Sequence, residues 1–271
     1  MANARSGRFI VTKEHRRFVE FADAVRKHRY IGICFGPAGV GKTISAQRFT
    51  RWNQAGPLLE TWGPRDPSDV IAYDALNRSK AAFYTPAVSE PPRQTRDQLG
   101  KLMSRVEGCI DLAQHPEQNL PNSKNPNQIE LLVIDEAERL SPQALEHIRD
   151  IFDRTGIGVI LIGMPGLEKR FERYPQLYSR IGFAHHYRPL KGDELTFVLS
   201  RNWRKLGLQL DDADFTDHQA IASIARITDG NFRLLHRLFV QIERILKIND
   251  LSLVTDEVVE AARSTLVIGA T

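Results

Sequence analysis

The chain has 271 residues, 42% of them hydrophobic and 26% charged, which is ordinary for a globular protein with a buried core. Its two cysteines exclude a disulfide framework, and no apolar run reaches transmembrane length. With 37 basic and 33 acidic residues the formal net charge is +4, which permits a nucleic-acid partner without requiring one. The first residues lack the apolar core of a signal peptide, so we expect a cytoplasmic protein with no membrane partner.

A glycine-rich loop follows the first predicted strand. Helical spacing over residues 14–27 predicts a helix, which leads into a strand at residues 30–35, and a further helix is expected over residues 44–52. The loop between this strand and the second helix reads Gly36, Pro37, Ala38, Gly39, Val40, Gly41, Lys42 and Thr43. Glycines at tight positions let backbone N–H groups surround phosphates, and the helix N-terminus adds a partial positive charge.

This order of strand, loop and helix predicts a phosphate-binding loop that holds ATP or GTP together with Mg²⁺. We expect the residues from Gly36 to Thr43 to contact the nucleotide. Lys42 is expected to neutralise the β and γ phosphates, and the Thr43 hydroxyl to bind Mg²⁺. The alternative is a glycine-rich turn that arises by chance. No base-reading motif is visible, so the preference for ATP rests on the resemblance described below.

Further strands and helices alternate along the chain. Apolar runs predict strands at residues 81–88, 128–134 and 157–163, and a fifth strand at residues 183–187. Helical spacing predicts helices at residues 93–112, 142–154 and 167–174, while residues 115–127 have the composition of a surface loop. Such alternation predicts an α/β fold with a parallel five-stranded sheet flanked by helices.

The pattern changes after Pro189, where residues 193–206, 217–228, 232–248 and 256–266 are all helical in spacing. We therefore predict three parts with a boundary near Leu190. Residues 1–28 form an N-terminal segment and helix, residues 29–190 an α/β nucleotide-binding subdomain, and residues 191–271 a small all-helical subdomain.

The predicted strand at residues 128–134 ends abruptly in the acidic residues Asp135 and Glu136. Ligands of open α/β sheets bind at such strand ends. We expect Asp135 to hold Mg²⁺ and Glu136 to polarise the attacking water as a catalytic base. The alternative is a strand that merely ends in a charged turn, and Glu138 is expected to be solvated. His147, His185 and His186 lack a further ligand at suitable spacing, so we predict no metal site beyond Mg²⁺.

Several segments together resemble the AAA+ ATPases of DNA transposition, of the TniB, TnsC and Mu B type. They are the phosphate-binding loop, the helical C-terminal part, and residues 132–140 (LVIDEAERL), 161–171 (LIGMPGLEKRF) and 174–183 (YPQLYSRIGF). The resemblance implies a P-loop sheet in which the fifth, first, fourth, third and second strands lie side by side in that order. It also implies a helical lid after the sheet.

The resemblance further implies a function. ATP would drive polymerisation of the protein into a ring or helical filament on duplex DNA, with little sequence preference. The assembly would mark a target for DNA recombination, recruit or stimulate a transposase, and contact other transposition-targeting proteins. Slow, assembly-dependent and Mg²⁺-dependent hydrolysis of ATP would then release the subunits.

Two arginines acquire catalytic roles from the same resemblance. Arg180 matches a finger that reaches the γ-phosphate bound by a neighbouring subunit, with Arg170, Arg173 and Arg188 as rivals nearby in sequence. Arg233 matches the lid arginine that touches the phosphates of its own subunit. An ordinary surface or salt-bridging arginine is the alternative for each.

One position departs from the family pattern. The strand at residues 157–163 is followed by Met164, where many AAA+ proteins carry a polar residue that helps to orient water. Methionine cannot do this, so either a neighbouring polar group replaces it or hydrolysis is slow.

The DNA contacts are the least constrained part of the sequence. Lys101 and Arg105, four residues apart on a predicted helix, are the candidate pair, and plain solvation is the alternative for either one. Two other functions stay open: an adaptor that loads a helicase, and an ATP-gated switch in signalling or defence.

Overall fold

The structure, a computed structural model, describes residues 9–63, 66–117, 127–211 and 214–266. Contacts between residues divide the chain into two units. The larger unit contains residues 17–36 and 42–187, and the smaller unit contains the described parts of residues 1–16 and 188–271 together with residues 37–41. Residues 1–8 and 267–271, which belong to the predicted first and third parts, lie outside the described residues, as does most of the predicted loop at 115–127.

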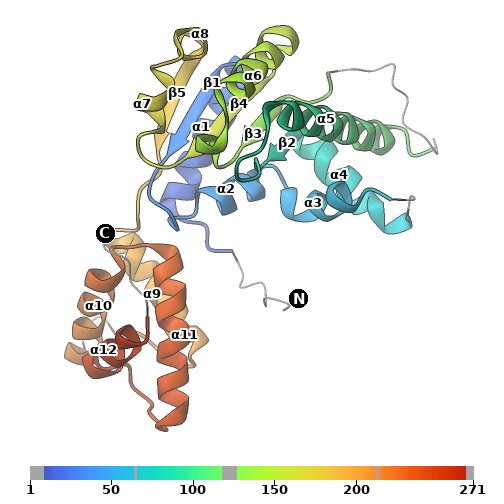
Figure 1. The fold of residues 1–271 in the computed structure, drawn as a ribbon. Helices are drawn as coiled ribbons and strands as arrows, with labels where there is room; N and C mark the ends of the chain where they lie inside the picture. Colours follow the sequence, from blue (N-terminus) through green and yellow to red (C-terminus); the bar gives the residue numbers. More distant parts are fainter. Residues whose placement is uncertain (1–8, 64–65, 118–126, 212–213, 267–271) are drawn as a thin grey trace. The chain divides into compact units, whose positions relative to one another are not determined.

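A parallel five-stranded sheet forms the centre of the larger unit (Figure 1). The strands are β1 (Ile31–Phe35), β2 (Ala81–Tyr84), β3 (Leu131–Ile134), β4 (Gly158–Gly163) and β5 (Ile181–His186). They lie in the order β2-β3-β4-β1-β5, and every neighbouring pair is parallel. The predicted α/β class and the expected order of the strands are therefore confirmed.

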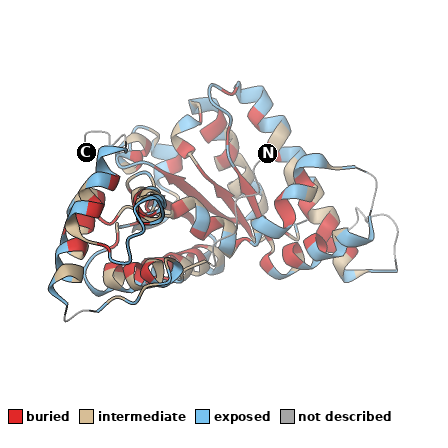
Figure 2. Ribbon diagram, turned by 90° about the horizontal axis from the view of Figure 1, so that it is seen from below, coloured by how far each residue is buried: buried red, intermediate tan, exposed pale blue. Residues whose placement is uncertain are grey.

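The inner strands are buried on both faces of the sheet, which explains why their sequences are nearly continuous apolar runs. Every residue of β3 and β4 is buried, whereas β5 at the edge alternates between half-buried and exposed residues (Figure 2). In the register, Phe35 of β1 pairs with Gly163 of β4, and Ile134 of β3 pairs with Leu161. The carboxyl ends of β1, β3 and β4 consequently lie at one edge of the sheet, where the chain leaves each strand in a loop.

Helices flank the sheet of the larger unit (Figure 1). They are α1 (Lys13–His28), α2 (Lys42–Phe49), α3 (Trp52–Thr61), α4 (Val70–Ser79), α5 (Pro92–Gln114), α6 (Pro142–Thr155), α7 (Leu167–Phe171) and α8 (Pro175–Tyr178). Two short 3-10 helices complete it: η1 (Pro67–Asp69) and η2 (Ala137–Arg139). The main apolar core packs between one face of the sheet and helices α3 to α8, with Leu76, Leu99, Ile110 and Phe171 fully buried.

Three local predictions in this unit were wrong. The expected helix over residues 44–52 is interrupted, because Arg51 adopts a left-handed conformation with φ 55° between α2 and α3. The strand expected over residues 81–88 stops at Tyr84, since Pro86 has no N–H to continue the ladder. Helix α4 was missed because Val70 and Ile71 are 54% and 62% exposed, which blurs its apolar spacing.

The smaller unit is built from helices, as predicted. They are α9 (Asp193–Lys205), α10 (Phe215–Thr228), α11 (Phe232–Ile248) and α12 (Asp256–Ser264). Their apolar faces share a core around Trp203, Leu238, Ile242 and Val259. None of the helices formed by the described residues combines the length and apolar composition that crossing a membrane requires.

Candidate functional site

Lys42 lies at the start of α2, directly after the glycine-rich loop. Its Nζ donates a hydrogen bond to the carbonyl oxygen of Gly36 at 2.6 Å, and the residue is only 8% exposed. Burial lowers the pKa of Lys42, because the charged form loses water, and the electrostatic influence of Cys34, Asp135, Glu138 and Glu136 acts in the opposite direction. The ammonium group is thus held at the edge of the sheet where β1 and β3 end.

Asp135 leaves the end of β3 and faces Thr43. Asp135 is only 3% exposed, and its backbone N–H donates a hydrogen bond to the carbonyl of Tyr84 at 2.8 Å. Burial raises the pKa of Asp135, while a hydrogen bond from the Thr43 hydroxyl opposes that rise.

This hydroxyl and buried carboxylate are hard oxygen donors, and a divalent cation would stabilise the buried charge. The pair therefore fits Mg²⁺. Further ligands would have to come from a phosphate or from water, since the described residues include no group of three His, Cys, Asp or Glu side chains arranged to hold a metal.

Glu136 stands in a constrained backbone conformation. It has φ 52°, in the left-handed region that a residue with a side chain adopts only at a cost. Its Oε2 lies 3.6 Å from the Nη2 of Arg139, and the side chain is 40% exposed. Arg139 in turn donates to the carbonyl of Pro86 at 3.0 Å. The carboxylate therefore sits at the open edge of the sheet, one residue beyond Asp135.

Glu138 was expected to be a solvated helix or turn residue, and it does lie in the 3-10 helix η2, but it is half-buried. Its Oε2 is buried and has no hydrogen-bond partner among the described residues. Burial raises the pKa of Glu138, and the neighbouring charge of Glu136 raises it further. In the sequence, three acidic residues lie close together in a turn that ends at the buried Leu140. Their spacing does not show which of the three side chains turns inward.

Arg170 of α7 fixes the turn that carries these carboxylates. Its guanidinium donates to three carbonyl groups of the turn, those of Ala137, Glu138 and Leu140. The carbonyl of Ala137 also accepts the backbone N–H of Leu140, so Arg170 adds to the bonds of the short helix η2. Arg170 is therefore a structural residue here, which removes it from the rivals of Arg180.

Residues 37–41 of the loop contact the first turn of α11 within the smaller unit. Asn231 Nδ2 donates to the carbonyl of Ala38 at 2.7 Å, and the backbone N–H of Arg233 donates to the carbonyl of Gly39 at 3.1 Å. Gly39 has φ 80°, and a Cβ atom there would lie 2.5 Å from Asn231 Oδ1. The backbone of Arg233 is thus joined to the loop, and its side chain is exposed. Sequence reasoning missed Asn231, whose signal was its place as the N-cap of a helix.

Arg180 is engaged with Asp153 of α6. Its Nε and Nη2 lie 2.6 Å and 2.8 Å from the two carboxylate oxygens. These hydrogen bonds lower the pKa of Asp153. The remaining rivals, Arg173 and Arg188, are exposed.

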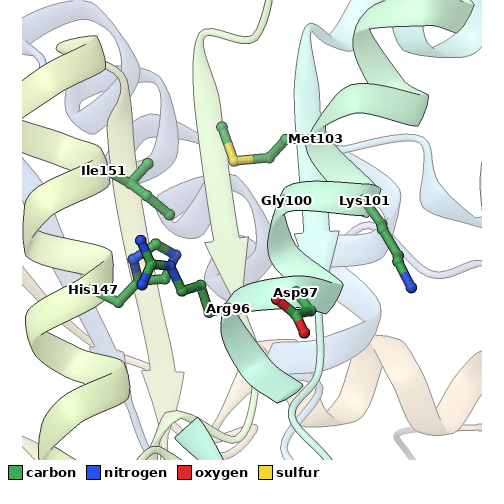
Figure 3. Close-up of a pocket in the computed structure, with 7 residues that line it drawn as sticks. All are labelled: Arg96, Asp97, Gly100, Lys101, Met103, His147 and Ile151. Carbon is green, nitrogen blue, oxygen red and sulfur yellow. The ribbon is translucent and has the colours of Figure 1, made fainter. Parts of the chain in front are cut away.

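The structure separates the two predicted DNA contacts. Arg105 donates from Nη1 to the carbonyl of Leu59 at 2.7 Å, and its guanidinium lies 5.1 Å from the ring centre of Trp62. Lys101 is exposed and lines an open pocket of about 490 Å³ between α5 and α6. The lining residues are Arg96, Asp97, Gly100, Lys101, Met103, His147 and Ile151 (Figure 3).

The pocket is basic at one end. Figure 3 shows the side chain of Arg96 beside the ring of His147, with Lys101 directed away from both. Burial lowers the pKa of His147, and the charge of Arg96 lowers it further. Neutral His147 thus leaves Arg96 and Lys101 as the cations of this pocket.

The chain is similar to proteins of known family. Residues 25–171 match the model of a family described as AAA domain. A Staphylococcus aureus protein described as a potential ATP-binding protein is 45% identical over 269 residues, which cover 96% of this chain and 97% of that protein. The Mu-like prophage FluMu DNA transposition protein B of Haemophilus influenzae is 25% identical over 243 residues, covering 85% of this chain and 71% of that protein.

Solved structures with a similar fold include those of two other proteins. The Thermotoga maritima RuvB Holliday junction branch migration motor has a TM-score of 0.54 at 16% identity, over 95% of this chain and 70% of that one. The Aeropyrum pernix ORC2 protein has a TM-score of 0.56 at 14% identity, over 96% of this chain and 70% of that one. At these identities the likeness concerns the fold alone.

Proposed function

The chain belongs to the AAA domain family, and we propose that this AAA+ ATPase is an ATP-dependent regulator of DNA transposition. In this proposal, ATP and Mg²⁺ bind at the carboxyl ends of β1 and β3. Bound ATP lets subunits assemble on duplex DNA as a ring or filament, and the assembly recruits or stimulates a transposase. Hydrolysis then releases the subunits.

The single observation that carries the proposal is the group of Lys42, Thr43, Asp135 and Glu136 at one edge of the sheet. Lys42 is placed to bind phosphate oxygens, and Thr43 with Asp135 to hold Mg²⁺, which supplies charge for the phosphates when bound. Glu136 is the carboxylate that we assign to accept a proton from the attacking water. The 45% identity to a protein described as ATP-binding supports ATP as the nucleotide.

Support for transposition and for DNA comes from two independent features. The chain is 25% identical to a Mu-like DNA transposition protein over most of its length. Its net charge of +4 is compatible with contact with phosphate backbones, which bind proteins with little regard to sequence. A neighbour's arginine, which we assign as Arg180, would make hydrolysis depend on assembly.

Electron microscopy of the protein with duplex DNA and a non-hydrolysable ATP analogue tests the proposal. We expect Lys42→Ala to abolish both nucleotide binding and assembly, because it removes the cation that offsets the phosphates. We expect Glu136→Gln to assemble with ATP and persist, because it keeps the binding groups and loses the base. Lys169→Ala, which removes an exposed lysine of α7, is the matched control and should behave as the wild-type protein.

Equal behaviour of Lys42→Ala and Glu136→Gln would contradict these separate roles. Monomers under every nucleotide condition would contradict assembly, and calorimetry that finds GTP bound in preference to ATP would correct the nucleotide. Addition of a purified transposase to the assembled protein tests the recruitment step. We expect faster strand transfer only when ATP is present.

A further inference from the structure

Glu138 has a buried carboxylate oxygen, Oε2, that makes no hydrogen bond of ordinary geometry with the described residues, although the backbone N–H of Met164 points to this carboxyl group and lowers its pKa. A buried polar atom without a partner is destabilising, so such atoms are uncommon in native proteins and each one calls for an explanation, such as a bound water or ligand. The oxygen concerned, Oε2, lies in the same turn as Glu136 and acts on the charge of Lys42. Glu138 Oε2 therefore lies at the edge of the sheet at which the nucleotide is proposed to bind.

The carboxyl group lies against the end of β4. A Cβ atom added to Gly163, the last residue of β4, would come within 2.4 Å of Glu138 Oε2, so glycine leaves the space that this oxygen occupies. The next residue, Met164, is 40% exposed and carries no polar side-chain group that can hold water. Glu138 thus places a carboxyl group at the end of β4 where the chain itself supplies a methionine.

We propose that Glu138 is a water-positioning residue: Oε2 accepts a hydrogen bond from the water that attacks the γ-phosphate, in place of the polar group absent at Met164. The inference rests on the proposed function and deepens it. In the step, the water oxygen forms a bond to phosphorus and the bond from phosphorus to the bridging oxygen of ADP breaks. The proton of the water passes to Glu136.

One feature of the surroundings suits this role. Arg170 donates to the carbonyl of Glu138 and to those of Ala137 and Leu140, so the turn cannot easily withdraw the carboxyl group.

Single-turnover ATP hydrolysis, ATP affinity and melting temperature are to be measured for Glu138→Ala and for the isosteric Glu138→Gln. We expect Glu138→Ala to lower the hydrolysis rate by about tenfold to a hundredfold, less than the loss of a group that itself accepts the proton, and to leave ATP affinity within about threefold. The melting temperature should not fall, because the substitution removes an unsatisfied buried atom. Glu172→Ala, at an exposed glutamate of the same unit, is the matched control and should change none of the three.

Gly163→Ala supplies a second, independent variant. Its added methyl group would displace the Glu138 carboxyl, so we expect a slower hydrolysis rate with ATP affinity retained. The double variant Gly163→Ala with Glu138→Ala should hydrolyse ATP almost as fast as Glu138→Ala alone, since both changes remove the same interaction. Gly63→Ala, at a position where a Cβ meets nothing within 4 Å, is its control.

The outcomes separate this inference from the proposed function. If the wild-type protein hydrolyses ATP and Glu138→Ala does so equally fast, the inference alone is overturned. A parallel loss of ATP affinity or of melting temperature in Glu138→Ala also overturns it, because the residue then supports binding or folding. If the wild-type protein binds ATP without hydrolysing it under any assembly condition, the hydrolytic part of the proposed function fails and takes the inference with it.

Discussion

Lys42 and the carboxyl groups of Asp135, Glu136 and Glu138 form an unbalanced set of charges. Burial lowers the pKa of Lys42 and raises those of Asp135 and Glu138, so in each case desolvation disfavours the charged form. A bound triphosphate would add more negative charge to the same place. The chemistry proposed for this edge of the sheet therefore depends on a divalent cation and on cations from outside the set.

Arg180 is our candidate for such an outside cation. In the single chain it pairs with Asp153, and both side chains are 30% exposed. The pair is bidentate, and Asp153 also bonds Arg149, so a phosphate of a neighbouring subunit would have to replace both hydrogen bonds from Arg180 to Asp153 while Arg149 continues to neutralise the carboxylate. The observed pair therefore does not argue against a finger that acts between subunits.

Mixing two inactive variants tests that role. Arg180→Ala lacks the finger but keeps its own binding site, and Glu136→Gln lacks the base but keeps its finger. We expect each variant to be inactive alone and the mixture on duplex DNA to recover at least about a tenth of the wild-type ATPase rate, because one subunit completes the other.

The control mixture replaces Glu136→Gln by the double variant Glu136→Gln with Arg180→Ala, and it should stay inactive. No recovery in the first mixture would mean that Arg180 does not act in trans. Should Arg173→Ala abolish hydrolysis while Arg180→Ala does not, the role belongs to Arg173, which is exposed in the same segment.

Helix α11 begins with a side chain that has two tasks. Asn231 Oδ1 accepts hydrogen bonds from the N–H groups of Arg233 and Leu234, which is the usual work of an N-cap. Its Nδ2 donates to the carbonyl of Ala38 in the glycine-rich loop. The start of the helix and the shape of the loop are consequently held by one amide group.

Two N-cap substitutions separate these tasks. Thr255 caps α12 in the same unit and makes no contact with the loop, so Thr255→Ala is a matched control for Asn231→Ala. We expect both to lower stability by about 1 kcal/mol. Only Asn231→Ala should also weaken ATP binding, because the loop loses a donor that orients it. Equal ATP affinities by calorimetry would show that the contact with Ala38 has no part in binding.

The whole chain carries only a small excess of positive charge, so any DNA-binding surface must come from local clusters. The described pocket between α5 and α6 has Arg96 and Lys101 on its wall. Arg105 is committed to Leu59 and Trp62. We therefore expect Lys101 and not Arg105 to contact DNA phosphates.

Salt-dependent binding of duplex DNA in the presence of an ATP analogue tests this assignment. Lys101→Ala should weaken binding to all sequences alike and reduce the slope of log affinity against log salt by about one. Arg105→Ala should leave the slope unchanged and lower the melting temperature, since it loses a hydrogen bond and the stacking on Trp62. A slope unaffected by either variant would place the DNA elsewhere on the protein.

Much of the fold was determined by local patterns that the sequence carries by itself. Continuous apolar runs predicted the buried strands, and the all-helical spacing after Pro189 predicted the smaller unit. The strand, loop and helix around Lys42 indicated a nucleotide site, because the chemistry depends on residues that are close in sequence. Helix α4 was not predicted, because its exposed apolar residues blur the helical spacing. The break between α2 and α3 was not predicted either, because it depends on the left-handed conformation of Arg51.

The tertiary structure alone decided which side chains meet. Asp135 and Thr43 are far apart in sequence and face each other because β1 and β3 end at the same edge of the sheet. Glu138 turns inward because Gly163 of another strand leaves it room, and no spacing along the chain contains that information. Sequence patterns record which face of an element is apolar, whereas the approach of polar atoms from separate elements depends on register and packing.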